Sequence, residues 1–259
     1  MLSILRPVAA LGRFVLATVA SVGRAGYLAR DAAHAVKKVS LWGPHLLPQM
    51  MRVGVESVPV ALFIATFTGV VLALQASYTF TGAMPLYLVG TLVGKTMLLE
   101  LGPVLTGLAL SGRVGANIAA EIGTMRVTEQ IDALETLAYD PVAYLVVPRV
   151  VAGAIMFPII VVLADALGIA AGWVTAQALL DMSSFEFVKG LQFLFDPFDL
   201  QFSIIKSISF GLTVTSLGCF FGFHTTGGAA GVGRATTQTV VVSSMVILLL
   251  DAFWGVILL

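Results

Sequence analysis

Long runs of apolar residues, separated by short polar segments, make up most of the chain. A helix needs about 20 apolar residues to cross the hydrocarbon core of a bilayer. Runs of that length occupy 50–78, 87–113, 141–180, 201–224 and 236–259. They predict an all-α integral membrane protein with about five transmembrane helices, in which 1–259 forms a single domain.

The segment 116–140 has a different pattern. Its apolar residues recur three and four positions apart with charged residues between them, which is typical of an amphipathic helix at a water-exposed surface. Asp140 and Pro141 follow, and these residue types favour the N-cap and the first turn of a new helix. We therefore expect one helix over 116–140 and the start of the next span at 141.

The N-terminal arm, 1–38, combines apolar residues with recurring arginines. Its arginines are Arg6, Arg13, Arg24 and Arg30. They argue against a cleavable signal peptide, whose apolar part is free of charge, and predict a basic amphipathic helix in the headgroup layer. The alternative is an uncleaved first span, because 14–22 is almost wholly apolar.

Lysine and arginine are unevenly distributed around the spans. They concentrate in the N-terminal arm, in 113–149 and at Arg234, whereas the loop 181–200 holds only Lys189. Since cytoplasmic loops are enriched in these residues, the first set is predicted to be cytoplasmic. Five spans then place the N-terminus and 116–140 in the cytoplasm, and the C-terminus and 181–200 outside.

Composition supports the membrane class and excludes others. Hydrophobic residues make up 58% of the chain and charged residues 11%, with a mean hydropathy of +1.00. A soluble domain carries about a quarter charged residues. The net charge of +0 argues against a nucleic-acid-binding face. A single cysteine, Cys219, allows no internal disulfide, and His34, His45 and His224 lack the spacing of metal ligands, so no metal site is expected.

The chain offers no sequence case for catalysis. The stretch GGAAGVGR resembles a phosphate-binding loop only superficially, because Gly233 is followed by Arg234 and a membrane helix precedes it. We interpret it as a flexible turn between two spans. Patterns typical of hydrolases, metalloproteases, kinases and deaminases are missing, so no catalytic residue and no cofactor are expected in this chain.

Charged residues inside the apolar runs are candidate functional groups. They are Lys95, Glu100, Asp165, Lys206 and Asp251. Each costs about 2.5–3.5 kcal/mol at the centre of a span, so each needs a partner or water. Lys95 and Glu100 lie about 140° apart around a helix and do not face each other. We expect pairing between helices or a hydrated cavity; alternatively, these charges only lock the bundle or reach to the surface.

The apolar face of 116–140 is a second candidate. It contains Ile118, Ile122, Met125, Ile131 and Leu134. These residues are numerous for a solvated connector, which is the alternative, and they suit a helix that docks in the groove of a partner protein.

At these residues the chain resembles a known family. The string AAEIGTMRVTEQIDALETLAYDP, preceded by LELGPVLTGLALSGRVGANI and followed later by GRATTQTVV, is similar to MlaE/YrbE permeases. The resemblance extends from about residue 40 to the C-terminus. It implies a homodimeric subunit of an ABC transporter that moves phospholipid or a related lipid between the bacterial inner membrane and a periplasmic carrier.

The resemblance also implies partners. They are a cytoplasmic ABC ATPase that binds ATP and Mg, a periplasmic MCE-domain hexamer and, in some systems, a STAS-domain protein. It makes 181–200 a periplasmic loop and 116–140 the coupling helix on the ATPase, through Glu121, Ile122, Met125, Arg126, Glu129, Ile131 and Leu134. The implied lipid-cavity residues are Glu100, Lys206 and Asp251. Leu99 stands where the family often has a basic residue, and Lys95 is the candidate substitute.

Two other functions compete with this one. An ion-coupled secondary transporter would use the buried carboxylates of Glu100, Asp165 and Asp251, although the chain lacks the internal repeat found in many such carriers. A scaffold that anchors a periplasmic complex would use the buried charges only for stability.

Overall fold

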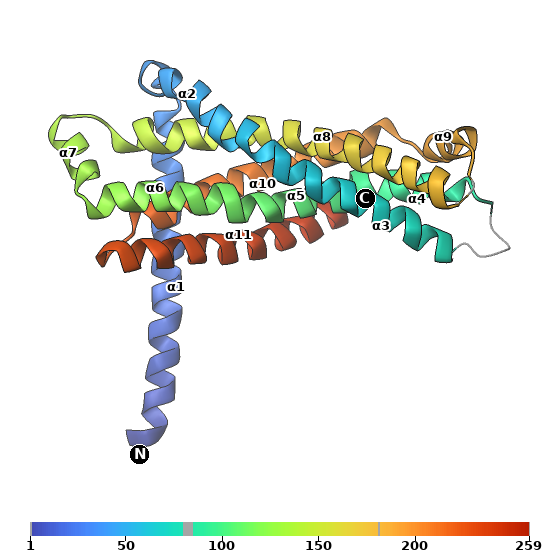
Figure 1. Ribbon diagram of the computed structural model, residues 1–259. Coiled ribbons are helices and arrows are strands. Elements are labelled where there is room, and N and C mark those ends of the chain that lie inside the picture. Colours follow the sequence, from blue (N-terminus) through green and yellow to red (C-terminus); the bar gives the residue numbers. More distant parts are fainter. Residues whose placement is uncertain (1, 80–84, 181, 259) are drawn as a thin grey trace.

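The predicted class and the five spans are confirmed. A computed structural model describes residues 2–79, 85–180 and 182–258, and the described residues form helices and short connections without a strand (Figure 1). Within them, 5 helical stretches are long and apolar enough to cross a membrane. They are Val39–Ala76, Leu88–Val127, Val142–Leu179, Pro197–Phe223 and Gly228–Leu258.

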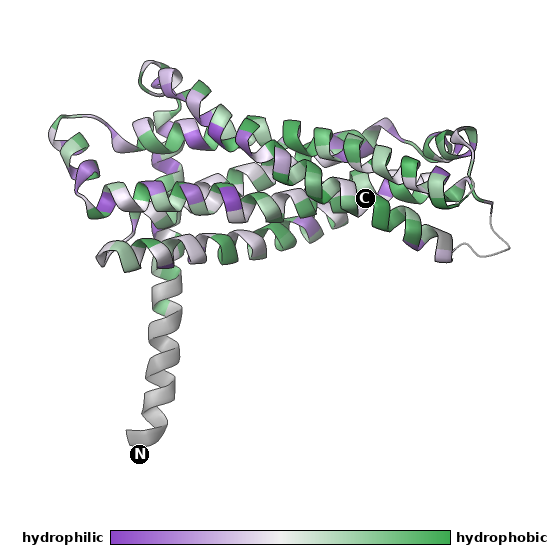
Figure 2. Ribbon diagram, in the orientation of Figure 1, coloured by the Kyte–Doolittle hydropathy of each residue, from purple (hydrophilic) through white to green (hydrophobic). Residues whose placement is uncertain are grey.

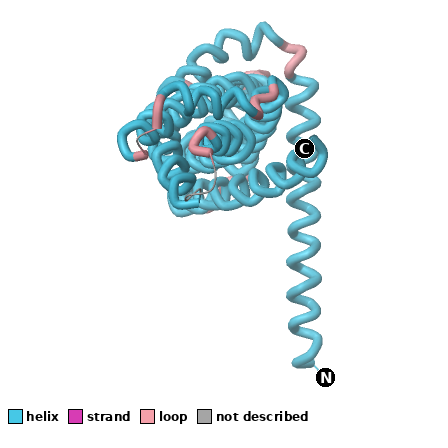
Figure 3. Tube along the Cα trace, turned by 90° about the vertical axis from the view of Figure 1, so that its right-hand side faces the viewer, coloured by secondary structure: helices cyan, strands magenta, loops and turns pink. Residues whose placement is uncertain are grey.

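The N-terminal helix α1, Leu2–Ala35, is not among these spans. Figures 1 and 3 show the long helices side by side along one axis and α1 running across that axis. The last turns of α1 contact the bundle at η4, Val142–Val146, and at α10, Pro197–Phe223. In Figure 1 the short helix α7 lies at one end of the bundle and α9 at the other, and we call these the α7 end and the α9 end.

The first two spans are interrupted helices. The first consists of α2, Val39–Val53, η1, Val55–Ser57, and α3, Val58–Thr79. The second runs from α4, Leu88–Thr96, through the π-turn η2, Met97–Leu101, α5, Gly102–Leu110, and the π-turn η3, Ser111–Gly115, into α6, Ala116–Val127. The boundary expected at 113 is therefore absent, and α6 prolongs the second span.

The helix expected over 116–140 is two helices. α6 ends at Val127 and α7 covers Gln130–Thr136. Glu129 between them has a φ of 61°, a left-handed conformation that ends a helix. Apolar periodicity continues across this residue, because both helices bury one face, and the break was therefore invisible in the pattern.

The third span begins as expected. Asp140 Oδ1 accepts hydrogen bonds from the backbone N–H groups of Val142 and Ala143, at 3.0 and 3.2 Å, and so caps η4. η4 leads into α8, Val147–Leu179. The loop expected at 181–200 contains a helix, α9, Ser184–Phe193, whose start is a capping box between Ser183 and Glu186.

The cap of η4 leads to a testable expectation. Burial raises the pKa of Asp140, but hydrogen bonds from Lys38 and from the Ala143 and Val142 N–H groups outweigh it and leave the pKa below its usual value. A carboxyl group with a depressed pKa stabilises the fold at neutral pH, and that contribution is lost as the pH falls through the folded-state pKa, below about 4.

Asp140→Ala should therefore lower the free energy of unfolding by about 1 kcal/mol at pH 7. The difference from the wild type should shrink below about pH 4. Thermal unfolding in detergent at both pH values measures this, and Asp31→Ala, at an exposed carboxylate of α1, is the control. A difference that is the same at both pH values would contradict the role of the carboxylate charge.

The last two spans meet in a tight turn. α10 is capped by a box between Asp196 and Asp199, and α11 covers Gly228–Leu258. The stretch GGAAGVGR is thus mostly the first turns of α11, and the interpretation as a flexible turn is wrong. Gly227 and Gly228 have φ values of 88° and 65°, and this conformation, which favours glycine, makes the turn possible.

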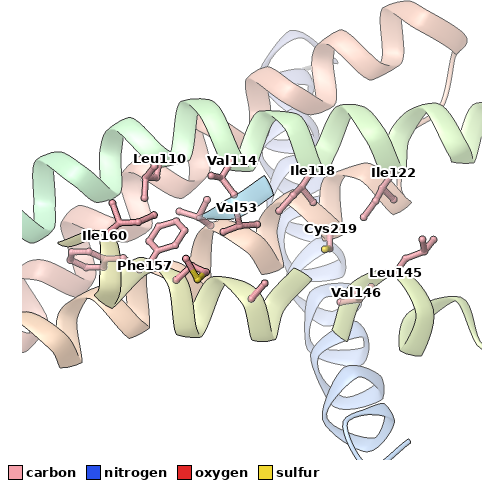
Figure 4. Close-up of a cluster of buried hydrophobic side chains, with 14 of the residues drawn as sticks. Val53, Leu110, Val114, Ile118, Ile122, Leu145, Val146, Phe157, Ile160 and Cys219 are labelled. Carbon is pink, nitrogen blue, oxygen red and sulfur yellow. The ribbon is translucent and has the colours of Figure 1, made fainter. Parts of the chain in front are cut away.

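Two of the three clusters of buried apolar side chains hold most of the bundle together. One, nearer the α7 end, joins α5, α6, α8 and α10 through side chains such as Leu110, Ile122, Phe157 and Cys219 (Figure 4). The other joins α3, α4, α8 and α9. Many large apolar side chains of the long helices are exposed, as in a protein that contacts lipid. Hydrophobic residues predominate along the middle of these helices (Figure 2). At the crossing of α3 and α8 a Cβ on Gly69 would lie 1.8 Å from the Gly168 carbonyl oxygen, so only glycine fits there.

Candidate functional site

Three of the predicted charged residues meet inside the bundle. Lys206 of α10 lies 3.1 Å from Glu100 Oε2 of η2 and 2.5 Å from Asp251 Oδ1 of α11. The contact with Glu100 is a hydrogen bond, and that with Asp251 is a close ion pair without hydrogen-bond alignment. We call these three residues the charge cluster. It confirms the expectation of pairing between helices.

The π-helical segment η2, which we also call the π-turn, explains part of the geometry of the charge cluster. In η2 the helix is wider than an α-helix, and such turns occur often at functional sites. The backbone carbonyl of Leu99 in this turn accepts a hydrogen bond of 2.8 Å from Lys206 Nζ. Leu99 thus contributes its backbone to the cluster although its side chain is apolar. A π-turn has no clear sequence signal, so this contact could not be predicted.

The three side chains of the charge cluster differ in their exposure to solvent. The Lys206 side chain is 0% exposed, that of Asp251 20% and that of Glu100 45%. Lys206 lies roughly 13 Å along α10 from its first residue, at 1.5 Å per residue, and thus within the span. The buried ammonium group therefore lies between two carboxylates, of which Glu100 is the more exposed, and we call the side of Glu100 the open side of the charge cluster.

Asp165 of α8 supports the cluster without joining it. Its Oδ2 accepts a hydrogen bond of 3.0 Å from Ser203, which precedes Lys206 by one turn of α10. A Cβ on Gly102 would lie 1.6 Å from Asp165 Oδ1, so α8 packs directly against the residue after η2. Asp165 is 2% exposed and helps to position the π-turn that carries Glu100.

Lys95 lies elsewhere. It pairs with Asp199 at 2.7 Å, and both line an apolar cavity of about 300 Å³ at the α9 end with Leu98, Ile169 and Phe195. As expected, Lys95 does not pair with Glu100, but the structure does not place it in the charge cluster either. Asp199 was missed as its partner because it was assigned to the loop 181–200, whereas it lies in the first turn of α10.

A second network lies at the α7 end. Glu121 Oε1 of α6 accepts a hydrogen bond of 2.9 Å from Arg52 of α2, and Glu121 Oε2 forms an ion pair of 2.8 Å with Arg149 of α8. The Arg149 side chain is only 4% exposed. Glu121, whose side chain is 40% exposed, therefore joins three helices of its own chain.

The apolar residues of 116–140 also point inward. Ile122 and Ile131 are 0% and 1% exposed, and Met125 and Leu134 pack against the same core. These side chains fill the chain's own core, so they do not form the free apolar face that sequence reasoning inferred. Glu129 and Arg126, which pairs with Asp132, lie at the surface near the α6–α7 break.

Comparison with known proteins decides the family. The family model described as permease MlaE matches residues 46–257, which include nearly all of the five spans. The chain belongs to the MlaE permease family. The match begins within α2, so α1 lies outside it.

Named relatives agree with this family. A probable ABC transporter permease protein of Rickettsia prowazekii is 39% identical over 239 residues, 92% of each chain. A probable ABC transporter permease protein of Synechocystis is 42% identical over 207 residues, 80% of this chain and 79% of the relative. The intermembrane phospholipid transport system permease protein MlaE of Haemophilus influenzae is 34% identical over 245 residues, 94% of each chain.

As an MlaE permease, the chain is a multi-pass membrane subunit of an ABC transporter. Such a subunit provides the membrane path rather than a catalytic centre. The charge cluster, the Asp165 contact and the Glu121 network are among the polar features inside its five spans.

Proposed function

We propose that this permease moves phospholipid between the bacterial inner membrane and a periplasmic MCE-domain hexamer, driven by a separate ABC ATPase that binds ATP and Mg. The observation that carries the proposal is the charge cluster, which opens to one side through Glu100. The name of the Haemophilus influenzae relative supports phospholipid as the cargo. A STAS-domain protein is a further candidate partner.

The cluster can exchange partners with a lipid headgroup. Lys206 Nζ is surrounded by oxygen atoms of Leu99, Glu100 and Asp251. A headgroup phosphate that approaches from the open side competes with the most exposed of these, Glu100, for the ammonium group. Lys206 would then hold the phosphate while Asp251 keeps the ammonium group partly neutralised.

A second copy of the chain is expected to enclose this open side. In the most apolar stretch of α11 only 11% of the residues are buried within the chain, and exposed apolar side chains follow one another along this helix. They include Val241, Met245, Leu248, Leu249 and Phe253. A homodimer across this face would place two charge clusters around one lipid cavity.

The α7 end is proposed to be cytoplasmic. It carries Arg52, Arg126, Arg149 and Arg234, in agreement with the enrichment of basic residues in cytoplasmic segments. The N-terminus is then cytoplasmic, the C-terminus periplasmic, and α9 faces the MCE-domain protein. In this orientation α1, with its exposed Leu16, Val19 and Val22, lies along the cytoplasmic surface of the membrane.

The continuous helices of the second span provide the proposed connection between the ATPase and the charge cluster. The surface around Glu129, between α6 and α7, is where we place the ATPase. From there α6 continues through η3 and α5 to η2, which carries Glu100. A displacement of α6 by the ATPase would therefore change the position of Glu100 relative to Lys206 and open or close the cavity.

Affinity purification from native membranes tests this function. An ABC ATPase should copurify, and Glu129→Lys should uncouple its activity from lipid movement. Asp31→Lys on α1 is the control with the same change of charge. We avoid Glu121→Lys, because it would leave the buried Arg149 without its partner. If no ATPase copurifies and lipid movement persists in Glu129→Lys, the ABC mechanism fails, and proton coupling through Asp165 becomes the function to test.

A further inference from the structure

Two cavities adjoin one another where α1 meets the bundle, and neither belongs to the charge cluster. The first, of about 340 Å³, lies between α1, the end of α10 and the start of α11. Its polar and charged lining residues are Ser21, Arg24, His224, Thr225, Thr226, Arg234 and Gln238. We call it the polar cavity.

The polar cavity has an unbalanced positive charge. Arg24 of α1 and Arg234 of α11 both line it, and the described residues of its lining include no carboxylate. By contrast, Arg52, Arg126 and Arg149 at the same end each form an ion pair with a carboxylate. Arg24 donates a hydrogen bond of 2.9 Å to Ser21 Oγ, which leaves most of its N–H donors available. Two guanidinium groups with unused donors suit an anion with several oxygen atoms, above all a phosphate.

The second cavity is apolar and is bounded by the same helix. It has a volume of about 270 Å³ and lies between α1, the start of α8 and α10. Its lining includes Leu28, Ala29, Val147, Val150, Leu217 and Phe220. Phe220 lines the polar cavity as well, so the two cavities are neighbours.

The order of the polar and apolar cavities along α10 matches the order of the phosphate and the acyl chains in a phospholipid. α10 runs toward the α7 end, and Leu217 of the apolar cavity comes before Phe220, which is followed by His224 of the polar cavity. The polar cavity is thus nearer the end of the bundle and the apolar cavity nearer its middle. A phospholipid has its phosphate toward the membrane surface and its acyl chains toward the membrane centre, in the same order.

We propose that the two cavities together bind one phospholipid, with its phosphate between Arg24 and Arg234 and part of an acyl chain against Leu28, Ala29 and Val150. Free inorganic phosphate could satisfy the guanidinium groups but would leave the apolar cavity unfilled. The bound lipid would join α1 to α11 and hold α1 along the membrane surface. The site is separate from the charge cluster, so it does not depend on the proposed transport function.

Native mass spectrometry of the full chain in neutral detergent tests the site. The probe is dioleoyl phosphatidylglycerol, and dioleoylglycerol, which has the same chains without phosphate, is the reference lipid. We expect the wild type to retain phosphatidylglycerol selectively. Arg24→Gln with Arg234→Gln should lower this retention about tenfold or more, given the strength of hydrogen bonds between charged groups.

Three variants separate the possible causes. Arg30→Gln with Lys37→Gln removes the same charge from exposed residues on and just after α1 and should retain lipid like the wild type. Arg24→Lys with Arg234→Lys keeps the charge and should restore part of the retention. Ala29→Phe fills the apolar cavity without a change of charge and should lower lipid retention as well.

The outcomes are distinct. Equal retention of phosphatidylglycerol by the wild type and the Arg24/Arg234 glutamine variant overturns the proposal, as does an equal loss in the Arg30/Lys37 variant. A competition arm adds inorganic phosphate. If phosphate binds the wild type but not the glutamine variant, and Ala29→Phe has no effect on lipid retention, the site binds free phosphate and the lipid assignment is wrong.

Discussion

Replacing Lys206 with methionine is expected to abolish lipid movement and to lower the free energy of unfolding by about 3–5 kcal/mol. Methionine has a similar length and no charge. It would leave Glu100 and Asp251 without the ammonium group that lies between them. Two carboxylates in a membrane span without a cation repel each other and are poorly solvated, which lowers the free energy of unfolding. The same change removes the cation that would bind a lipid phosphate.

Two measurements separate these effects. Thermal unfolding in detergent reports stability, and transfer of labelled phospholipid from proteoliposomes that contain the complete transporter reports movement. Lys37→Met, at an exposed residue between α1 and α2, is the matched control and should behave like the wild type. Wild-type stability and transfer in Lys206→Met would show that the cluster serves neither the fold nor the lipid.

A variant without any charge in the cluster separates its effect on stability from its effect on lipid movement. Lys206→Met combined with Glu100→Gln and Asp251→Asn removes every charge and should recover much of the stability, because no unpaired charge stays buried. Lipid movement should remain absent, since no cation is left for a headgroup phosphate. Recovery of transport in this variant would assign the cluster a purely structural role.

Replacing Glu121 with glutamine is expected to lower the free energy of unfolding by about 2–3 kcal/mol. The carboxylate is the shared partner of Arg52 and of Arg149, and Arg149 is nearly inaccessible to solvent. Arg149 Nη1 also donates to the Leu145 carbonyl at 2.7 Å, but that contact does not neutralise its charge. The change removes the ion pair that links α6 to α8.

Glu129→Gln provides the contrast. Glu129 lies at the exposed break between α6 and α7, so its replacement should leave the unfolding temperature unchanged while it weakens ATPase coupling. The double variant Glu121→Met with Arg149→Met should be more stable than Glu121→Gln alone, because both members of the buried pair are then apolar. An unchanged unfolding temperature in Glu121→Gln would show that water reaches Arg149 and that the network is not structural.

Much of the fold could be predicted, and the misses have physical reasons. The five spans follow from apolar runs that no soluble fold could cover, and the start at Asp140 follows from a local cap that depends only on neighbouring residues. The Gly-rich start of α11 was misjudged because glycine disfavours helix in isolation, whereas packing in the bundle supports it.

The predicted site residues also divide into those identified by a local sequence signal and those whose partners depend on helix packing. Charge within an apolar run identified Glu100, Lys206 and Asp251 as residues that need partners, and the structure brings these three together. Lys95 carries the same signal but pairs with Asp199, since the choice of partner depends on which helix faces which. The inward direction of Ile122 and Ile131 likewise depends on how α6 and α7 lie against the core.

The sequence by itself determined that this chain spans the membrane about five times, roughly where each span lies, and which charges need a partner within them. These properties follow from transfer energies and local hydrogen bonds, which act on short stretches of chain. Only the tertiary structure decided that Lys206 contacts the Leu99 carbonyl, that Glu121 holds Arg149, and that Arg24 faces the cavity of Arg234. Each of these arrangements brings together residues far apart in the chain, and it depends on the packing of whole helices.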